Sequence, residues 1–207
     1  MVNTNQQTQE VPGPTSYLSF EQMNIIISFR RLWQQLAMWM KTLLMSIIGN
    51  LGNKMAVTDR LFVGVPTQFF DVFSVFYGPQ LSQQFRNLLA NFIQNGWMLM
   101  EAINNKDTEA ANTNTVQWYK SADEIATFLA RINVVYWDEI LWKRHLYQFI
   151  RIYIDEMTAA VGGDYQKEVE LYDSIEDLAY LMGNYMARGI IARSLAMGSE
   201  VPNFVED

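Results

Sequence analysis

Residues 19–52 read SFEQMNIIISFRRLWQQLAMWMKTLLMSIIGNLG, and this stretch predicts a long helix with a defined start and end. Ser19 and Gln22 have the spacing of a capping box, in which each side chain bonds the backbone N–H of the other residue. Gly49 and Asn50 tolerate the left-handed turn that ends a helix. The apolar side chains that recur every four and three residues, and so form one packed helix face, are Ile25, Phe29, Leu32, Leu36, Trp39 and Leu43.

The opposite stripe of this predicted helix is polar but almost free of charge. Its members are Asn24, Ser28, Arg31, Gln35, Thr42 and Ser46. A helix that faces water on one side normally carries Lys and Glu there. The uncharged stripe therefore favours a helix contacted on several sides, either at the centre of a bundle or inside an oligomer.

The same periodicity continues along the chain. It predicts short helices near residues 53–63 and 67–77, and longer ones after Pro79, Thr108, Val135 and Asp164. We expect a break at residues 64–66, a stop at Gly78 and a helix N-cap at Thr108. Gly96 leaves a gap in its apolar seam, which would let a neighbouring helix or a large ring approach.

Short connections between long helices make neighbouring helices antiparallel. The predicted fold is all-α, an antiparallel up-and-down helical bundle of about five long helices plus a short helical pair. We expect one domain over residues 17–198, a disordered N-terminal arm over residues 1–16 and an acidic tail over residues 199–207.

Composition excludes several kinds of site. The chain has 207 residues, a formal charge of −7, no Cys and one His, so neither a disulfide framework nor a Cys-based metal site can form. The acidic balance argues against a nucleic-acid partner. The most apolar run, residues 36–48, is too short to span a bilayer. We therefore expect no transmembrane segment, no secretion signal and a cytoplasmic protein.

Charge is divided unevenly between the two halves of the chain. Residues 1–104 hold six Lys/Arg and five Asp/Glu, whereas residues 105–207 hold nine Lys/Arg and seventeen Asp/Glu. A charge-poor half is either the centre of the core or a surface covered by partners. This asymmetry predicts a homo-oligomer that associates through its first half.

No sequence motif supports catalysis. The glycines form no phosphate-binding loop and no nucleophile elbow. His145, the one possible imidazole base, stands one step off an apolar seam beside Lys143 and Arg144. These cations disfavour its charged form, so we interpret it as a boundary histidine rather than an acid or base. We expect no catalytic, cofactor-binding or metal-binding residues and no cofactor. The sequence therefore favours a protein without enzymatic activity.

The carboxylates of the last two helices are the one candidate for a metal site. They are Asp155, Glu156, Glu168, Glu170, Asp173, Glu176 and Asp177. Di-iron bundles combine Glu with Glu-x-x-His motifs, and the residue three positions before His145 is Trp142. A solvated charged face is therefore the favoured interpretation of these residues.

Three stretches of the chain resemble small all-helical proteins from spore-forming bacteria. The stretches are residues 32–39 (LWQQLAMW), 118–126 (WYKSADEIA), and 163–165 with 172–177 (GDY and YDSIED). The resemblance covers roughly residues 29–192, and it implies a spore-associated location as an alternative to a cytoplasmic one. Members of that group have no assigned activity, and some carry an acetylglutamate-kinase label that nothing in this chain supports.

The resemblance implies a ferritin-like bundle with inward histidines at three positions. In this chain those positions hold Leu36, Phe149 and Leu178, which removes the nitrogen ligands. The leading hypothesis is a non-enzymatic, structural, self-assembling helical-bundle protein. The alternative is a metal- or small-ligand-binding ferritin-like bundle that uses Asp155, Glu156, Glu168 and Asp173 in place of the lost histidines.

Overall fold

The computed structural model describes residues 18–198, and all the regular structure in that range is helical. This confirms the predicted all-α bundle. The predicted arm, residues 1–16, and tail, residues 199–207, lie outside the described residues. The helices are α1 (Phe20–Ile48), α2 (Lys54–Asp59), the π-helix η1 (Arg60–Gly64), α3 (Val65–Asn104), α4 (Thr108–Ile132), α5 (Glu139–Gly162) and α6 (Tyr165–Ala196).

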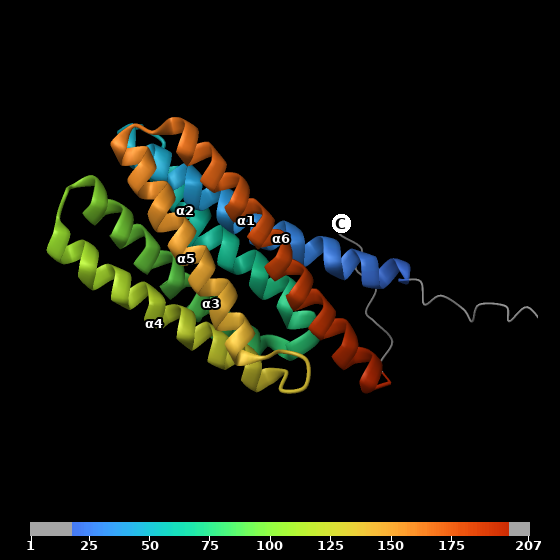
Figure 1. Ribbon diagram of the computed structural model, residues 1–207. Helices are drawn as coiled ribbons and strands as arrows, with labels where there is room; N and C mark the ends of the chain where they lie inside the picture. The colour runs from blue at the N-terminus through green and yellow to red at the C-terminus, as the bar shows by residue number, and fades with distance from the viewer. Residues whose placement is uncertain (1–17, 199–207) are drawn as a thin grey trace, which may run out of the picture.

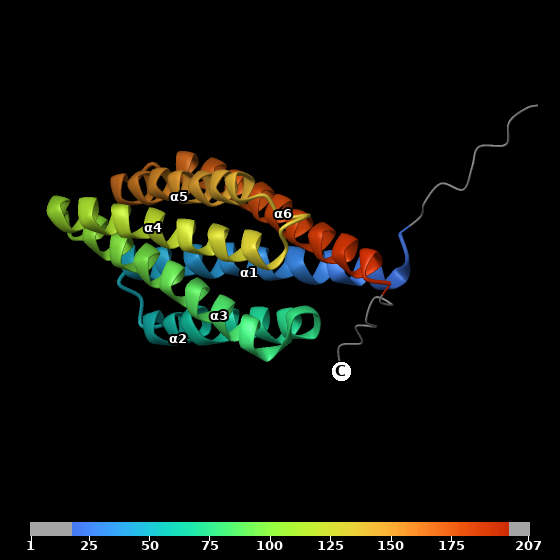
Figure 2. The ribbon, with the colours of Figure 1, turned by 90° about the horizontal axis from the view of Figure 1, so that it is seen from below.

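The five long helices pack side by side (Figure 1). Helix α3 turns back partway along its length, so its longer, later part runs in the same direction as α1, and α4, α5 and α6 then alternate in direction (Figures 1 and 2). Helix α1 contacts α6 and α3, and α4 lies between α3 and α5. Figure 2 shows α5 on one side of α1, and α2 with the start of α3 on the other. The uncharged polar stripe of α1 is explained by this central place, because α2, η1, α3, α5 and α6 all contact the helix.

The segment between α1 and the long part of α3 differs from its prediction. Residues 64–66 do not break the helix, because η1 runs directly into α3 and Pro66 stands in the first turn of that helix. The break lies at Gly78, with φ of 72° and ψ of 169° inside α3. The predicted stop at this glycine is therefore confirmed.

Side-chain caps fix the starts of four helices. The capping box of Ser19 and Gln22 is present at α1. The predicted cap at Thr108 is wrong by one residue, since the Asp107 carboxylate accepts the Ala110 N–H and Thr108 is already helical. Asp138 and Asp164 cap α5 and α6 in the same way.

Aromatic rings from all five long helices fill the core. The ring of Trp33 on α1 stacks on Trp142 of α5, with centroids 6.1 Å apart. Trp142 also meets Tyr185 of α6 at 5.0 Å. Phe92 of α3 lies 5.5 Å from Trp118 of α4. Packing of large apolar surfaces away from water is the main stabilising term of such a core.

Gly96 and Gly183 each let a neighbouring group come closer than a side chain would allow. At Gly96 a Cβ would lie 2.9 Å from Trp118, so the predicted approach of a ring is confirmed. At Gly183 a Cβ would lie 2.6 Å from the Cα of Arg30, which places the backbone of α6 directly on that of α1. Because backbone cannot rotate aside, Gly183 sets the distance between these helices.

We predict that Gly183→Ala destabilises the fold by about 2 kcal/mol or more, since the methyl group overpacks a backbone contact. The measurement is the free energy of unfolding in urea. Gly162→Ala is the matched control, because nothing lies within 4 Å of its Cβ position. Equal stabilities of the two variants would contradict the proposed role of Gly183.

Candidate functional site

A buried ionic cluster joins three helices through Lys41 of α1, Glu156 of α5 and Glu168 of α6. The Lys41 ammonium lies 3.4 Å from a Glu156 oxygen and forms an ion pair with Glu168. The side chain of Lys41 is 23% exposed, whereas those of Glu156 and Glu168 are 0% and 6% exposed. The sequence offered a signal for this cluster, because Lys41 is the single charge within the apolar run of residues 36–48.

The surroundings of the cluster favour a proton on Glu156. The pKa of Glu156 is raised to about 7, chiefly because the carboxyl is buried; Lys41 acts to lower this pKa and the neighbouring Glu168 carboxylate acts to raise it. Its Oε2 atom has no hydrogen-bond partner. The ring of Tyr172 covers the Lys41 ammonium at 4.3 Å. With Glu156 protonated, one cation and one anion remain, and the cluster is neutral.

The predicted solvated face is correct for Asp155, Glu170, Asp173, Glu176 and Asp177, which are exposed. It is wrong for Glu156 and Glu168, which point into the bundle. Of the four carboxylates in the metal-binding alternative, the structure therefore brings together only Glu156 and Glu168, through Lys41. Within residues 18–198, no three His, Cys, Asp or Glu side chains gather to hold a metal ion, and the Lys41 ammonium lies beside the two acids.

His145 is more deeply packed than a boundary residue. It is 8% exposed, and its ring meets Trp142 and Tyr185 edge to face at 6.4 and 5.7 Å. Burial lowers the pKa of His145, and Arg144 lowers it further. The effect of a neighbouring cation was expected, but the larger cause is burial. A neutral imidazole among aromatic rings matches a packing role.

The three positions singled out by the resemblance are all in the core. Leu36 and Phe149 are fully buried and Leu178 is 4% exposed. Helices α1 and α6 run antiparallel, as the bond from Arg30 to Asn184 and the ion pair from Lys41 to Glu168 show. Membership of the group stays a prediction.

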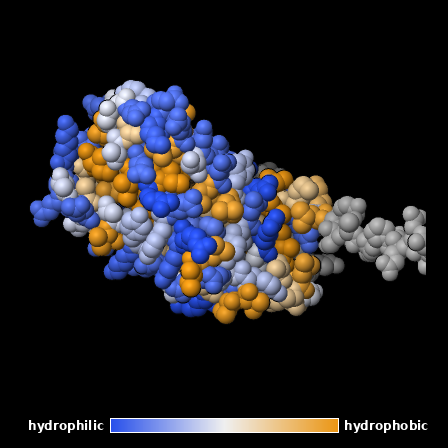
Figure 3. Space-filling view, viewed as in Figure 1, coloured by the Kyte–Doolittle hydropathy of each residue, from blue (hydrophilic) through white to orange (hydrophobic). Residues whose placement is uncertain are grey.

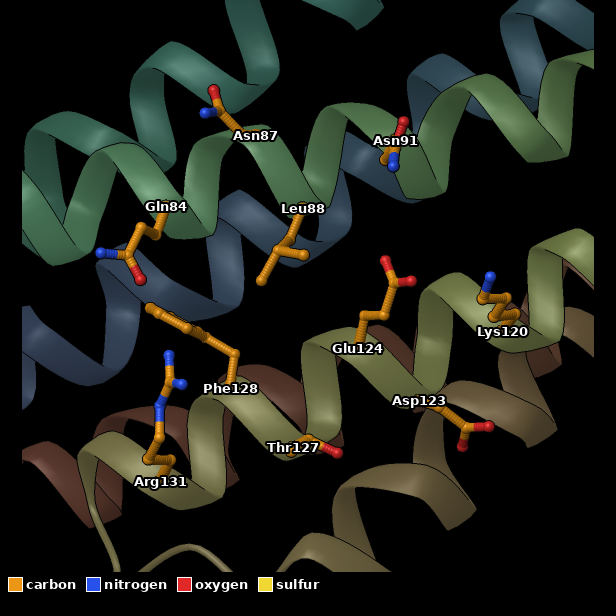
Figure 4. A pocket seen from close by; sticks show the side chains of 10 residues that line it. All are labelled: Gln84, Asn87, Leu88, Asn91, Lys120, Asp123, Glu124, Thr127, Phe128 and Arg131. Atoms are coloured by element: carbon orange, nitrogen blue, oxygen red, sulfur yellow. The ribbon is translucent and has the colours of Figure 1, made fainter.

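A groove of about 570 Å³ runs along the surface between α3 and α4 (Figure 4). Its floor contains Leu88 and Phe128. The α3 wall carries uncharged amides, and the α4 wall carries Lys120, Glu124 and Arg131. In Figure 4, Leu88 and Glu124 extend into the space between the two helices. The guanidinium of Arg131 lies 5.6 Å from the centre of the Phe128 ring.

The outer face of α3 beside this groove carries a stripe of uncharged side chains, five amides and one methionine. Its exposed members recur every four and three residues and are Gln80, Gln84, Asn87, Asn91, Gln94 and Met98. Between Asp71 and Glu101 the one charged side chain is Arg86. We call these six residues the amide stripe. The low charge of the first half predicted a surface of this kind, but not its place on α3.

The face formed by α5 and α6 is different in character. Hydrophilic side chains cover much of it, with hydrophobic ones between them (Figure 3). Lys143 pairs there with Glu139 at 2.9 Å and with Asp123 at 3.6 Å. This matches the concentration of charge in the second half of the chain, which keeps that face in contact with water.

One helical stretch, Lys54–Asn104, is long and apolar enough to cross a membrane by length and composition alone. In its most apolar window, 33% of the residues are buried inside the bundle. The core helix of a soluble protein passes the same test. The expected absence of a spanning segment therefore stays a prediction.

Comparison with known proteins adds no relative. The sequence matches no protein-family model, and neither a curated protein nor a solved structure is significantly similar to it. Any inference about function therefore rests on the chain's own residues.

We predict that Glu156→Gln removes a specific pH dependence of stability. Because the folded pKa of about 7 lies above the ordinary value of 4.5, Glu156 stabilises the fold below pH 4.5, and this contribution is lost as pH rises through 7. One pKa unit corresponds to about 1.4 kcal/mol, so the loss is about 3 kcal/mol. The measurement is the unfolding free energy of both proteins from pH 4.5 to 8.

Taking the difference between wild type and variant removes the opposite contribution of His145, whose lowered pKa makes stability rise with pH. Glu168→Gln is the matched substitution. It leaves Lys41 without its ionised partner and should lower stability at neutral pH more than Glu156→Gln does. A wild-type-minus-Glu156→Gln difference that does not change with pH would contradict the protonated state of Glu156.

Proposed function

We propose that this protein is a non-enzymatic, self-associating helical-bundle protein whose amide stripe on α3 contacts further copies. The observation that carries the proposal is the stripe itself, six exposed uncharged side chains at heptad spacing on a long helix. Heptad spacing keeps a stripe on one face along the helix, so that a second helix can lie against it.

Amide side chains suit contact between identical surfaces. Each Asn or Gln offers both donors and an acceptor, so one amide can pair with another without a complementary charge. A surface that meets its own copy about a two-fold axis must be self-complementary in this way. Like charges on such a face would repel, and the stripe contains none.

The chemistry of the described residues supports a role without catalysis. His145 is packed among rings with a lowered pKa, and the buried carboxylates are engaged with Lys41. The groove between α3 and α4 holds no imidazole that could act as a base. These observations favour contact with other copies, rather than catalysis, as the role of the charge-poor side of the bundle.

We predict that Asn87→Lys with Asn91→Lys weakens self-association, because four added cations face one another when two copies meet. The measurement is light scattering during size-exclusion chromatography at several protein concentrations. We expect wild type to shift toward a larger mass as concentration rises, and the variant to stay monomeric at concentrations where wild type has shifted.

The control variant, Gln148→Lys with Gln166→Lys, adds the same charge to exposed amides of α5 and α6. It should associate as wild type does. If both double variants change the mass equally, or if neither does, the amide stripe is not the assembly surface.

A further inference from the structure

The exposed face of α4 beside the groove carries a second stripe at heptad spacing. Its members are Thr113, Gln117, Lys120, Glu124, Thr127 and Arg131, and all six are exposed. This α4 stripe lies across the groove from the amide stripe of α3. Unlike the amide stripe, the α4 stripe contains charged side chains. The order of these charges along the helix indicates which charges a partner surface must place opposite them.

Glu124 and Arg131 are seven residues apart, so they lie on the same face of α4, about 10 Å from each other along the axis. Neither of them forms an ion pair with another residue of the range 18–198. Thr127 stands midway between them. A second α4 running antiparallel across Thr127 would therefore place each Glu124 opposite the Arg131 of the other copy.

A different antiparallel register would pair Glu124 with Lys120 of a second copy. The centre of that arrangement falls near Asp123, which would bring two Asp123 carboxylates toward each other. Asp123 is also engaged within its own chain, by the Tyr147 hydroxyl at 2.7 Å and by Lys143 at 3.6 Å. Repulsion between like charges therefore favours the register centred on Thr127.

The favoured register would also bring the apolar side chains at this end of the groove into the contact between the two copies. Leu88 and Phe128 line the floor close to Thr127. Beyond the end of α4, Val134 and Val135 are 78% and 81% exposed, among the most exposed large apolar side chains described. These valines stand three and four residues after Arg131, in the region that a second antiparallel copy would approach.

We infer that the groove between α3 and α4 is a two-fold contact surface for a second copy of this chain, with reciprocal ion pairs between Glu124 and Arg131. The inference rests on the proposed self-association and names its geometry. A two-fold contact is closed, so it yields a dimer rather than an open filament. The amide stripes of the two copies then run alongside the charged pairs.

The test uses charge reversals, because a reciprocal pair responds to them in a distinctive way. Glu124→Arg places cations opposite cations, and Arg131→Glu places acids opposite acids. We expect each single variant to raise the dimer dissociation constant about tenfold or more, which corresponds to about 1.4 kcal/mol. The double variant exchanges the charges and should restore the dimer, and an equimolar mixture of the single variants should form the mixed dimer.

The measurement is native mass spectrometry, which separates mixed from homotypic dimers when one variant is isotopically labelled. Lys120→Glu should leave the dimer unchanged, whereas it would break a dimer in the alternative register and so overturn this one. Circular dichroism checks that each variant remains folded.

Two negative results have different meanings. If wild type stays monomeric at every concentration, the proposed function fails and the inference fails with it. If wild type dimerises but the charge reversals neither weaken it nor restore it in combination, the inference is wrong while self-association stands.

Discussion

The close crossing of α6 over α1 at Gly183 is the constraint on which the rest of the bundle depends. With no side chain at that position, the backbone of α6 reaches the backbone of α1 at Arg30. The two helices then run antiparallel along their lengths, and Gln34 meets Glu176 further along. The same register carries Glu168 to Lys41. A shift of either helix would separate this acid from its cation inside the protein.

The ionic cluster shows how three charged side chains can stand in an apolar bundle. Two acids and one base would leave a net negative charge in a low-dielectric interior, which is costly. Because the pKa of Glu156 is raised to about 7, protonation of this acid removes that charge as the pH falls below 7. The cluster links α1, α5 and α6, while Tyr153 adds a hydrogen bond of 2.6 Å to the Ala37 carbonyl. These polar contacts join α1 to α5 and α6 inside the bundle.

Much of the fold follows from the sequence because helix periodicity and local breakers are local signals. Such local signals predicted the capping box at Ser19, the helix break at Gly78 and the gap in the apolar seam at Gly96. The burial of Glu156 and Glu168 was not predicted, although each stands three residues from a seam residue, Tyr153 or Leu171. Periodicity shows which face of its helix a residue occupies. It does not show that Lys41, on a different helix, pairs with these two buried carboxylates.

The continuous helix through residues 64–66 was missed for a related reason. Gly and Pro normally interrupt a helix, yet Gly64 ends η1 and Pro66 stands in the first turn of α3 with no break between the two helices. The contact between Gly189 and Trp137, where a Cβ would lie 2.0 Å from the indole nitrogen, also joins segments far apart in the sequence. The place of the amide stripe on α3 depended on such contacts, because they decide which face of that helix stays exposed.

The surface is thus divided into a charged face over α5 and α6 and an uncharged stripe on α3 with a groove beside it. The central claim is that the second surface meets further copies of the chain. Sedimentation velocity of the tag-free wild type over a hundredfold range of concentration tests this most directly. The account predicts a sedimentation coefficient that rises with concentration toward a dimer or larger species. A constant coefficient at the monomer value over the whole range would contradict it.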